Sequence, residues 1–359
     1  MLLAFLAILL TLFLVIGIHE AGHALAAHLF HIKIKRIAIG FGKPLVQWQG
    51  RSGCEWVLGR WFLGGYVQLN NTRIAPVKPE EEASCFDKKP IWQRIIVLLA
   101  GACANIITAW LAFILVFSIG IHYRIPEIET VQANSVAAKA GIMPQEQFLS
   151  IAGRDTFSWQ DVGQELIVSW GQKNIPVSLK TSTGEIKQTT LDLSQIGFNE
   201  QARSLLASLG LVPNVKAAQQ LLKAPSLGNA IQQANNTISH YVYFFLIILK
   251  QLFTGVIPFS VLLGPIGLFA TSIASLSQGI LVFLYFIAGL SVAVAFINLF
   301  PIPGLDGGAI LYTLIEKIRG EPISIALEIL IYRLMMVLLF LILVQLLKND
   351  LALFIMRPH

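Results

Sequence analysis

Charged residues are scarce in this chain. Of its 359 residues only 13% are Asp, Glu, Lys or Arg, whereas 55% are hydrophobic. A soluble domain of ordinary composition is about 25% charged, so the chain has too few charges to cover a wholly soluble fold. The same apolar content excludes a disordered chain, which stays solvated along its length. The composition therefore predicts a polytopic membrane protein with a soluble insert.

Cysteine is also scarce. Cys54, Cys85 and Cys103 all lie in the first third of the chain. No Cys-x-x-Cys pair is present, which excludes a zinc knuckle, and none of the three falls in the polar stretch 124–225. A disulfide framework is therefore excluded for that stretch.

Long runs without a charge predict four transmembrane segments, because a helical span needs about 20 apolar residues. The segments that we expect are helix 1–30, helix 91–122, segment 280–315 and helix 323–347. The first run ends in His19 and Glu20, and it lacks the basic start and the cleavage site of a signal peptide. We therefore expect it to be retained as the first span.

The segments between the spans are more polar. Segment 31–90 is strand-like and punctuated by glycine, which predicts a β region. Segment 124–225 carries polar residues at regular intervals and short alternating stretches, which predict a soluble domain of strands and short helices. Segment 226–279 is amphipathic, and its stretch 241–265 is expected to be broken by glycine and proline. We expect it to lie along the membrane or to dip into it without crossing.

The net charge of +6 indicates orientation. Segment 31–94 holds 11 of the 26 Lys and Arg residues, and Lys317 and Arg319 lie in the connector before the last span. By the positive-inside rule these segments face the cytoplasm, which puts the soluble insert and both termini outside it. Nucleic acid is not expected as a partner, because no basic helix or aromatic-basic platform is present.

The sequence HEAGH at 19–23 is the clearest candidate for a chemical site. On a helix His19 and His23 share one face, so both imidazoles can bind one metal ion. Glu20 is then placed to take a proton from water. Ionisable residues at membrane depth are costly and usually functional. The alternative is a helix end that merely reaches the head groups.

Zinc in a catalytic site needs a third protein ligand. Asp306 is the best candidate, since it is the first charge after 55 uncharged residues and lies among helix-breaking prolines and glycines. If segment 280–299 runs from outside to inside, Asp306 approaches the same membrane side as His23. The alternatives are a boundary carboxylate without a ligand role, or a ligand from Glu55 or the run Glu80, Glu81 and Glu82.

Other polar residues admit two interpretations. Asn298 could donate a hydrogen bond to a developing oxyanion or make a helix–helix contact. Gly64, Gly65, Tyr66 and Val67 could form a hairpin edge that pairs with an unwound substrate, or a hairpin of purely structural role. Asn105 is more typical of helix packing than of chemistry.

Together these motifs resemble the site-2 protease family of intramembrane zinc metalloproteases, and the likeness covers nearly the whole chain. It rests on HEAGH at 19–23, GFG at 40–42, LGGYVQL at 63–69, AGACAN at 100–105, GPIG at 264–267 and NLFPIPGLDGG at 298–308. The stretch 135–162 resembles a PDZ domain.

The resemblance implies that His19, His23 and Asp306 bind Zn²⁺ and that Glu20 is the general base and acid. It also implies that Asn298 holds the substrate or the oxyanion, and that the hairpin at 64–69 enters the membrane.

The implied fold is a polytopic α-helical membrane protein with four transmembrane helices, a membrane-associated β-hairpin and one extracytoplasmic PDZ-like α+β domain. The implied partners are the lipid bilayer and single-pass membrane proteins already shortened by another protease, such as anti-sigma factors and signal-peptide remnants. The chain is expected to act as a monomer in a bacterial inner membrane, with its site toward the cytoplasm.

The chain departs from the family pattern in places. Bacterial members that the chain resembles carry two PDZ domains, whereas this chain has room for one. Gln145 and Glu146 stand where Gly-Asp is usual, and Ala102 replaces a usual proline.

Two other classes of protein are alternatives to a protease. A transporter would show paired repeats, which the sequence lacks, and a membrane-anchored PDZ scaffold would not explain His19, Glu20, His23 and Asp306 together.

Overall fold

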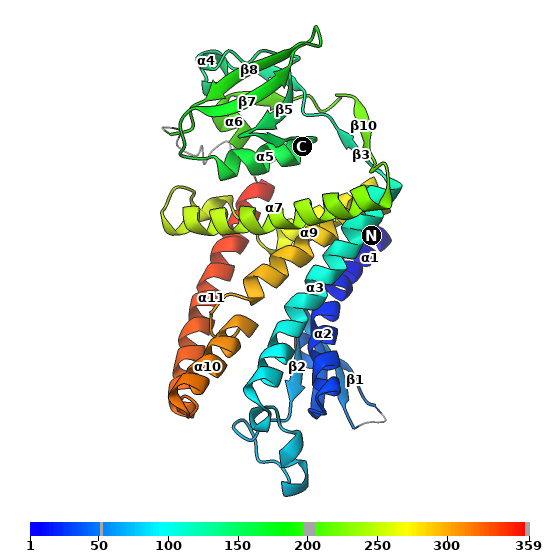
Figure 1. Ribbon diagram of the computed structural model, residues 1–359, viewed down its shortest axis with the longest axis vertical. Coiled ribbons are helices and arrows are strands. Elements are labelled where there is room, and N and C mark those ends of the chain that lie inside the picture. The colour runs from blue at the N-terminus through cyan, green and yellow to red at the C-terminus, as the bar shows by residue number, and fades with distance from the viewer. Residues whose placement is uncertain (51–52, 195, 197–204, 356–359) are drawn as a thin grey trace. The chain divides into compact units, whose positions relative to one another are not determined.

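The computed structural model describes residues 1–50, 53–194, 196 and 205–355 (Figure 1). It divides into two compact units, each described here by itself. The first unit consists of Met1–Ile114 and Leu268–Val344. The second consists of Leu115–Gly267 and the chain from Gln345 onward.

Long apolar helices form most of the first unit. Its first helix runs without interruption through α1 (Leu2–Thr11), the π-helical stretch η1 (Leu12–Gly17) and α2 (Ile18–Leu29). The other helices that lie wholly or partly in this unit are α3 (Ile91–Ile119), α8 (Pro265–Gln278), α9 (Ile280–Asn298), α10 (Asp306–Arg319) and α11 (Ile325–Ile355).

Among the described residues, four helices are long and apolar enough to cross a membrane. They are Leu2–Leu29, Ile91–Ile119, Ile280–Asn298 and Ile325–Ala352. They match the four predicted spans in number and order. The third span is shorter than the predicted segment 280–315, because Pro301 and Pro303 interrupt the helix and a separate helix, α10, begins at Asp306. The fourth is longer than predicted.

Two kinds of contact hold the first unit together. Apolar side chains of the first helix and of α9 pack into one cluster, with Ala7 and Phe283 fully buried. Farther along, the guanidinium of Arg94 on α3 donates to both carboxylate oxygens of Glu316 on α10, at 2.8 and 2.9 Å. This paired, charge-assisted geometry fixes α10 against α3.

The predicted β region is a two-stranded antiparallel hairpin of β1 (Ile34–Gln49) and β2 (Glu55–Leu69). In its register Ile37 faces Val67 and Ile39 faces Gly65. The 3₁₀ turns η2 (Pro79–Ser84) and η3 (Phe86–Lys88) follow before α3. The hairpin directly follows α2 in the chain and lies beside it (Figure 1).

The second unit contains a mixed domain of short strands and helices, as predicted for 124–225. Its elements are β3 (Ile121–Arg124), β4 (Ile128–Val131), α4 (Val136–Lys139), β5 (Gln147–Ile151), β6 (Arg154–Asp155), α5 (Trp159–Val168), β7 (Ile175–Lys180), β8 (Ile186–Leu191), α6 (Leu205–Leu209), β9 (Leu211–Pro213) and β10 (Gln219–Leu222). An antiparallel sheet has the order β6-β5-β7-β8, and two separate strand pairs join β3 to β10 and β4 to β9.

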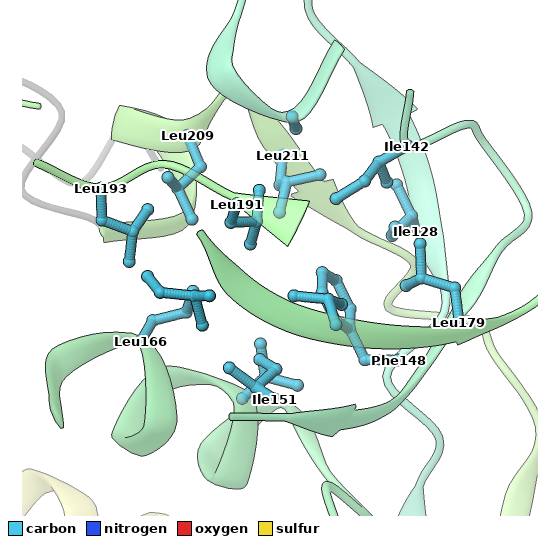
Figure 2. Close-up of a cluster of buried hydrophobic side chains, with 14 of the residues drawn as sticks. Ile128, Ile142, Phe148, Ile151, Leu166, Leu179, Leu191, Leu193, Leu209 and Leu211 are labelled. Atoms are coloured by element: carbon cyan, nitrogen blue, oxygen red, sulfur yellow. The ribbon is translucent and has the colours of Figure 1, made fainter. Parts of the chain in front are cut away.

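Side chains from these strands and helices share one apolar core. Figure 2 shows Phe148 and Ile151 of β5 near Leu166 of α5 and Leu179 of β7, and all four are fully buried. Alternate residues of β7 are buried and exposed, which is the pattern of a sheet with one face covered. The alternating stretch at 175–180 in the sequence has this cause.

Helix α7 (Leu227–Phe253) runs unbroken and ends just before Gly255. The helix is then interrupted between Gly255 and α8, where the short turn η4 (Phe259–Val261) forms, so stretch 241–265 is broken at its glycines and prolines as predicted. Within the second unit, Asp350 near the end of α11 accepts hydrogen bonds from the backbone amides of Gly264 and Ile266, at 2.8 and 2.9 Å. This partner allows α11 to continue past the predicted end at 347, because the buried carboxylate is satisfied.

Candidate active site

Three side chains that are distant in sequence converge in the first unit. His19 and His23 lie one turn apart on α2, and Asp306 is the first residue of α10. The Nε2 atoms of the two histidines are 3.2 Å apart. Each Nε2 atom also lies 3.2 Å from Oδ2 of Asp306. The donor atoms thus form an equilateral triangle.

This triangle fits zinc. Four ligands at about 2.0–2.1 Å in a tetrahedron lie about 3.3 Å from one another, close to the 3.2 Å measured here. Two imidazole nitrogens and one carboxylate oxygen are donors that zinc prefers, and three protein ligands leave a position open for water or substrate.

The competing carboxylates are engaged elsewhere. Glu55 on β2 pairs with Arg36 of the neighbouring strand. Glu81 accepts from Lys33 at 2.6 Å and from Asn70 at 3.1 Å. Asp306 therefore remains the third donor that the structure brings to the histidines.

The ionisation of Asp306 suits a metal ligand. Burial favours its neutral form, but hydrogen bonds with His19 and His23 outweigh burial and lower the pKa of this carboxyl to about 2. The carboxylate is therefore ionised at neutral pH, as metal binding requires.

Helix α3 lies against the outer side of both histidines. The carbonyl oxygen of Val97 is 2.7 Å from Nδ1 of His23, and Nδ2 of Asn105 is 3.4 Å from Nδ1 of His19. Gly101 stands between them, where a Cβ atom would come within 2.3 Å of His23 Nε2 and 2.8 Å of His19 Nε2. Spacing of four residues puts all three on one helix face.

Sequence reasoning missed the contribution of α3. It assigned Asn105 to helix packing and did not single out Gly101. The four-residue spacing of Val97, Gly101 and Asn105 is visible in the sequence. It carries no meaning, however, until α3 is known to face the HEAGH helix.

Strand β2 lies directly against Glu20. The Glu20 side chain is buried, and its carboxylate is hydrogen-bonded by the backbone amide of Val67. A Cβ atom at Gly65 would lie 3.0 Å from Cγ of Glu20 and 2.9 Å from the carbonyl oxygen of Ala38. The structure therefore brings two of the four predicted hairpin residues to the general-base candidate.

The remaining predicted site residues are Gly64, Tyr66 and Asn298. Tyr66 is half-buried, and its hydroxyl is 3.4 Å from Nη1 of Arg36. Gly64 adjoins Gly65 and has a φ of 149°. Asn298 is half-buried at the end of α9, where its Nδ2 donates to the carbonyl of Val294 at 3.1 Å, within its own helix.

Comparisons with known proteins agree with this chemistry. Residues 7–342 match the family described as Peptidase family M50. The chain is 28% identical to the regulator of sigma E protease of Haemophilus influenzae, over 93% of this chain and 95% of that protein. It is 26% identical to the regulator of sigma-E protease RseP of Escherichia coli, over 93% and 95%. It is also 26% identical to a Pasteurella multocida protein named as a zinc metalloprotease, over 92% and 94%. The chain therefore belongs to peptidase family M50 and is a zinc metallopeptidase of the site-2 type.

Proposed function

We propose that this peptidase cleaves peptide bonds inside the transmembrane segments of other membrane proteins. One observation carries the proposal. The triangle of His19, His23 and Asp306 donor atoms includes two ligands on the helix Leu2–Leu29, which is long and apolar enough to cross a membrane. A hydrolytic centre at that depth has transmembrane segments as its neighbours.

In this proposal His19, His23 and Asp306 hold zinc. The bound ion would acidify water and polarise the scissile carbonyl. Glu20 accepts the proton of the attacking water as the new C–O bond forms. Glu20 then delivers that proton to the leaving amine as the C–N bond breaks. The hydrogen bond from the Val67 amide holds the Glu20 carboxylate in position for both transfers.

A transmembrane helix hides its carbonyls in internal hydrogen bonds, so the substrate has to unwind before attack. The edge of β2 can stabilise the unwound form. Because the Val67 amide points toward Glu20, the backbone groups of Gly65, two residues away, turn to the same edge. An extended substrate that pairs along this edge lies beside the catalytic carboxylate.

Asn298 is proposed to bind the substrate carbonyl or the oxyanion. Its amide now donates to Val294 in its own helix. Binding a substrate therefore requires the Asn298 side chain to turn away from the helix axis.

The proposed substrates are single-pass membrane proteins already shortened by another protease, such as anti-sigma factors and signal-peptide remnants. Two relatives are named as regulators of sigma E, which supports a substrate connected with the regulation of sigma factors. We further propose a bacterial inner-membrane monomer with its site toward the cytoplasm. The mixed domain of the second unit would be one extracytoplasmic PDZ-like domain. The relatives' alignments span 422 and 428 residues against 359 in this chain, which supports one domain fewer here.

The test is metal analysis of the purified protein followed by cleavage of a model transmembrane substrate, with and without chelator. We expect zinc-dependent cleavage. Glu20→Gln should abolish cleavage and leave zinc bound, whereas Asp306→Ala should lower zinc occupancy. Glu185→Gln, at an exposed position, is the matched control. Cleavage by Glu20→Gln at the native rate would refute the role of Glu20, and full zinc occupancy in Asp306→Ala would refute its role as a ligand.

A further inference from the structure

Asn105 carries a buried side-chain amide in the apolar helix α3, and this amide is incompletely hydrogen-bonded. Its side chain is fully buried, and its Nδ2 atom faces Nδ1 of His19 at 3.4 Å. Within the described part of the chain its Oδ1 atom has no hydrogen-bond partner. A buried amide that makes poor hydrogen bonds costs free energy, so its presence here calls for a function.

The ring nitrogen of His19 that carries the proton determines whether Asn105 must accept or donate a hydrogen bond. If Nε2 of His19 faces a metal ion, the ring proton sits on Nδ1, which is then a donor. An amide nitrogen cannot accept that proton, whereas the amide oxygen can. Rotating the Asn105 amide by 180° exchanges its nitrogen and oxygen at unchanged positions. The rotation puts Oδ1 opposite the Nδ1 donor of His19.

His23 shows the same arrangement with a different acceptor. Its Nδ1 lies 2.7 Å from the backbone carbonyl of Val97, eight residues before Asn105 on the same face of α3. Metal-binding histidines usually donate their second ring N–H to such an acceptor, which fixes the tautomer and the orientation of the ring. A side-chain substitution at Val97 leaves its backbone carbonyl in place as the acceptor for His23. The acceptor for His19, in contrast, is lost if the Asn105 side chain is replaced.

We propose that Asn105 is a positioning residue of the zinc site, whose side-chain carbonyl accepts the Nδ1 proton of His19 and thereby holds Nε2 toward the metal. The inference rests on the proposed ligand role of His19. It differs from helix packing in one consequence. A packing role changes the stability of the protein with or without metal, whereas a positioning role changes the affinity for zinc.

The test is the dissociation constant for zinc of the full-length protein in detergent, measured by competition with a chromophoric chelator. Loss of such an outer partner weakens metal binding by about 10–100-fold, so Asn105→Leu, which has a similar branched shape but no acceptor, should bind zinc more weakly by that factor. Asn105→Asp keeps an acceptor oxygen, and a carboxylate is itself a usual partner of a metal-binding histidine, so this variant should lose less than about 10-fold in zinc affinity. Thr108→Ala is the control, because the Thr108 hydroxyl donates to the Ala104 carbonyl of the same helix at 2.8 Å.

Thermal unfolding of the metal-free variants shows which of them fold, and Asn105→Ala replaces Asn105→Leu if the latter does not. Native zinc affinity in the folded apolar variant would overturn the inference, and so would equal losses in Asn105→Leu and Asn105→Asp. A native protein that binds no zinc, or a His19→Ala variant that binds it normally, would instead refute the proposed zinc site.

Discussion

One methyl group at position 101 should empty the metal site while the membrane helices stay folded. In Gly101→Ala the new Cβ would lie 2.3 Å from Nε2 of His23 and 2.8 Å from Nε2 of His19. Non-bonded heavy atoms come to rest about 3.5 Å apart. The His23 nitrogen therefore has to retreat by about 1 Å, or α3 has to move away as a whole.

Neither response is compatible with the ligand triangle. Ligand distances in a metal site tolerate deviations of about 0.2 Å, so a displacement of about 1 Å removes His23 from the metal. We expect zinc affinity to fall by more than about 100-fold, beyond the loss of an outer partner. Overpacking costs about 1–3 kcal/mol of stability, and the better helix propensity of alanine offsets about 1 kcal/mol of this. The fold should therefore persist.

The assay is the zinc content of the purified variant after equilibration in a metal buffer, together with its circular dichroism and thermal unfolding. Gly163→Ala is the matched control, because a Cβ at this helical position in α5 meets nothing within 4 Å. The control should keep native zinc content. A Gly101→Ala protein with one zinc per chain and native cleavage would refute the contact between α3 and the histidines.

Two further predictions concern groups around and away from the metal. Gly65→Ala should push β2 away from Glu20, since its Cβ would lie 3.0 Å from Glu20 Cγ. We expect kcat/KM for cleavage to fall at least about 10-fold while the zinc content stays unchanged. A loss of zinc in parallel with the loss of activity would contradict this prediction. In the second unit, burial raises the pKa of Glu165 to about 7 against the opposing charge of Arg154, while burial and Arg154 lower the pKa of His240, 3.2 Å away. The raised pKa means that the Glu165 contribution to stability is present below about pH 4.5 and is lost as the pH rises to about 7. Glu165→Gln should therefore be more stable than the native protein by about 3 kcal/mol at pH 8 and equal to it near pH 4. Hydrogen exchange of α5 in the full-length chain, corrected for intrinsic rates, measures the difference, and equal protection at pH 8 would refute it.

The spans could be predicted because their cause is local. A run of about 20 apolar residues is sufficient for a transmembrane helix, and the four candidate helices begin within a few residues of the predicted positions. The end of α11 could not be predicted in this way. Lys348 and Asp350 indicate a helix end by their charge, but Asp350 is satisfied by backbone amides some 85 residues earlier in the chain. A sequence does not show that partner.

The residues of the candidate site also differ in whether their position has a local cause in the sequence or depends on a distant partner. The spacing of His19 and His23 is a property of one helix, so the pattern predicts their shared face. Asp306 could be inferred because it is the first charge after a long apolar run, and the structure brings it to the histidines. The predicted role of Asn298 stays a prediction, since its observed hydrogen bond lies within α9.

The parts of the site that sequence reasoning missed depend on how closely two helices approach. Gly22 of α2 and Gly101 of α3 stand at this contact, and a Cβ at Gly22 would come within 2.4 Å of the Ala100 carbonyl. Small residues on both helices allow their backbones to approach. That approach is what brings the Val97 carbonyl and the Asn105 amide within reach of the two histidines. The two glycines therefore belong to the metal site as much as its ligands do, because a larger side chain at either one would separate both histidines from their outer partners at once.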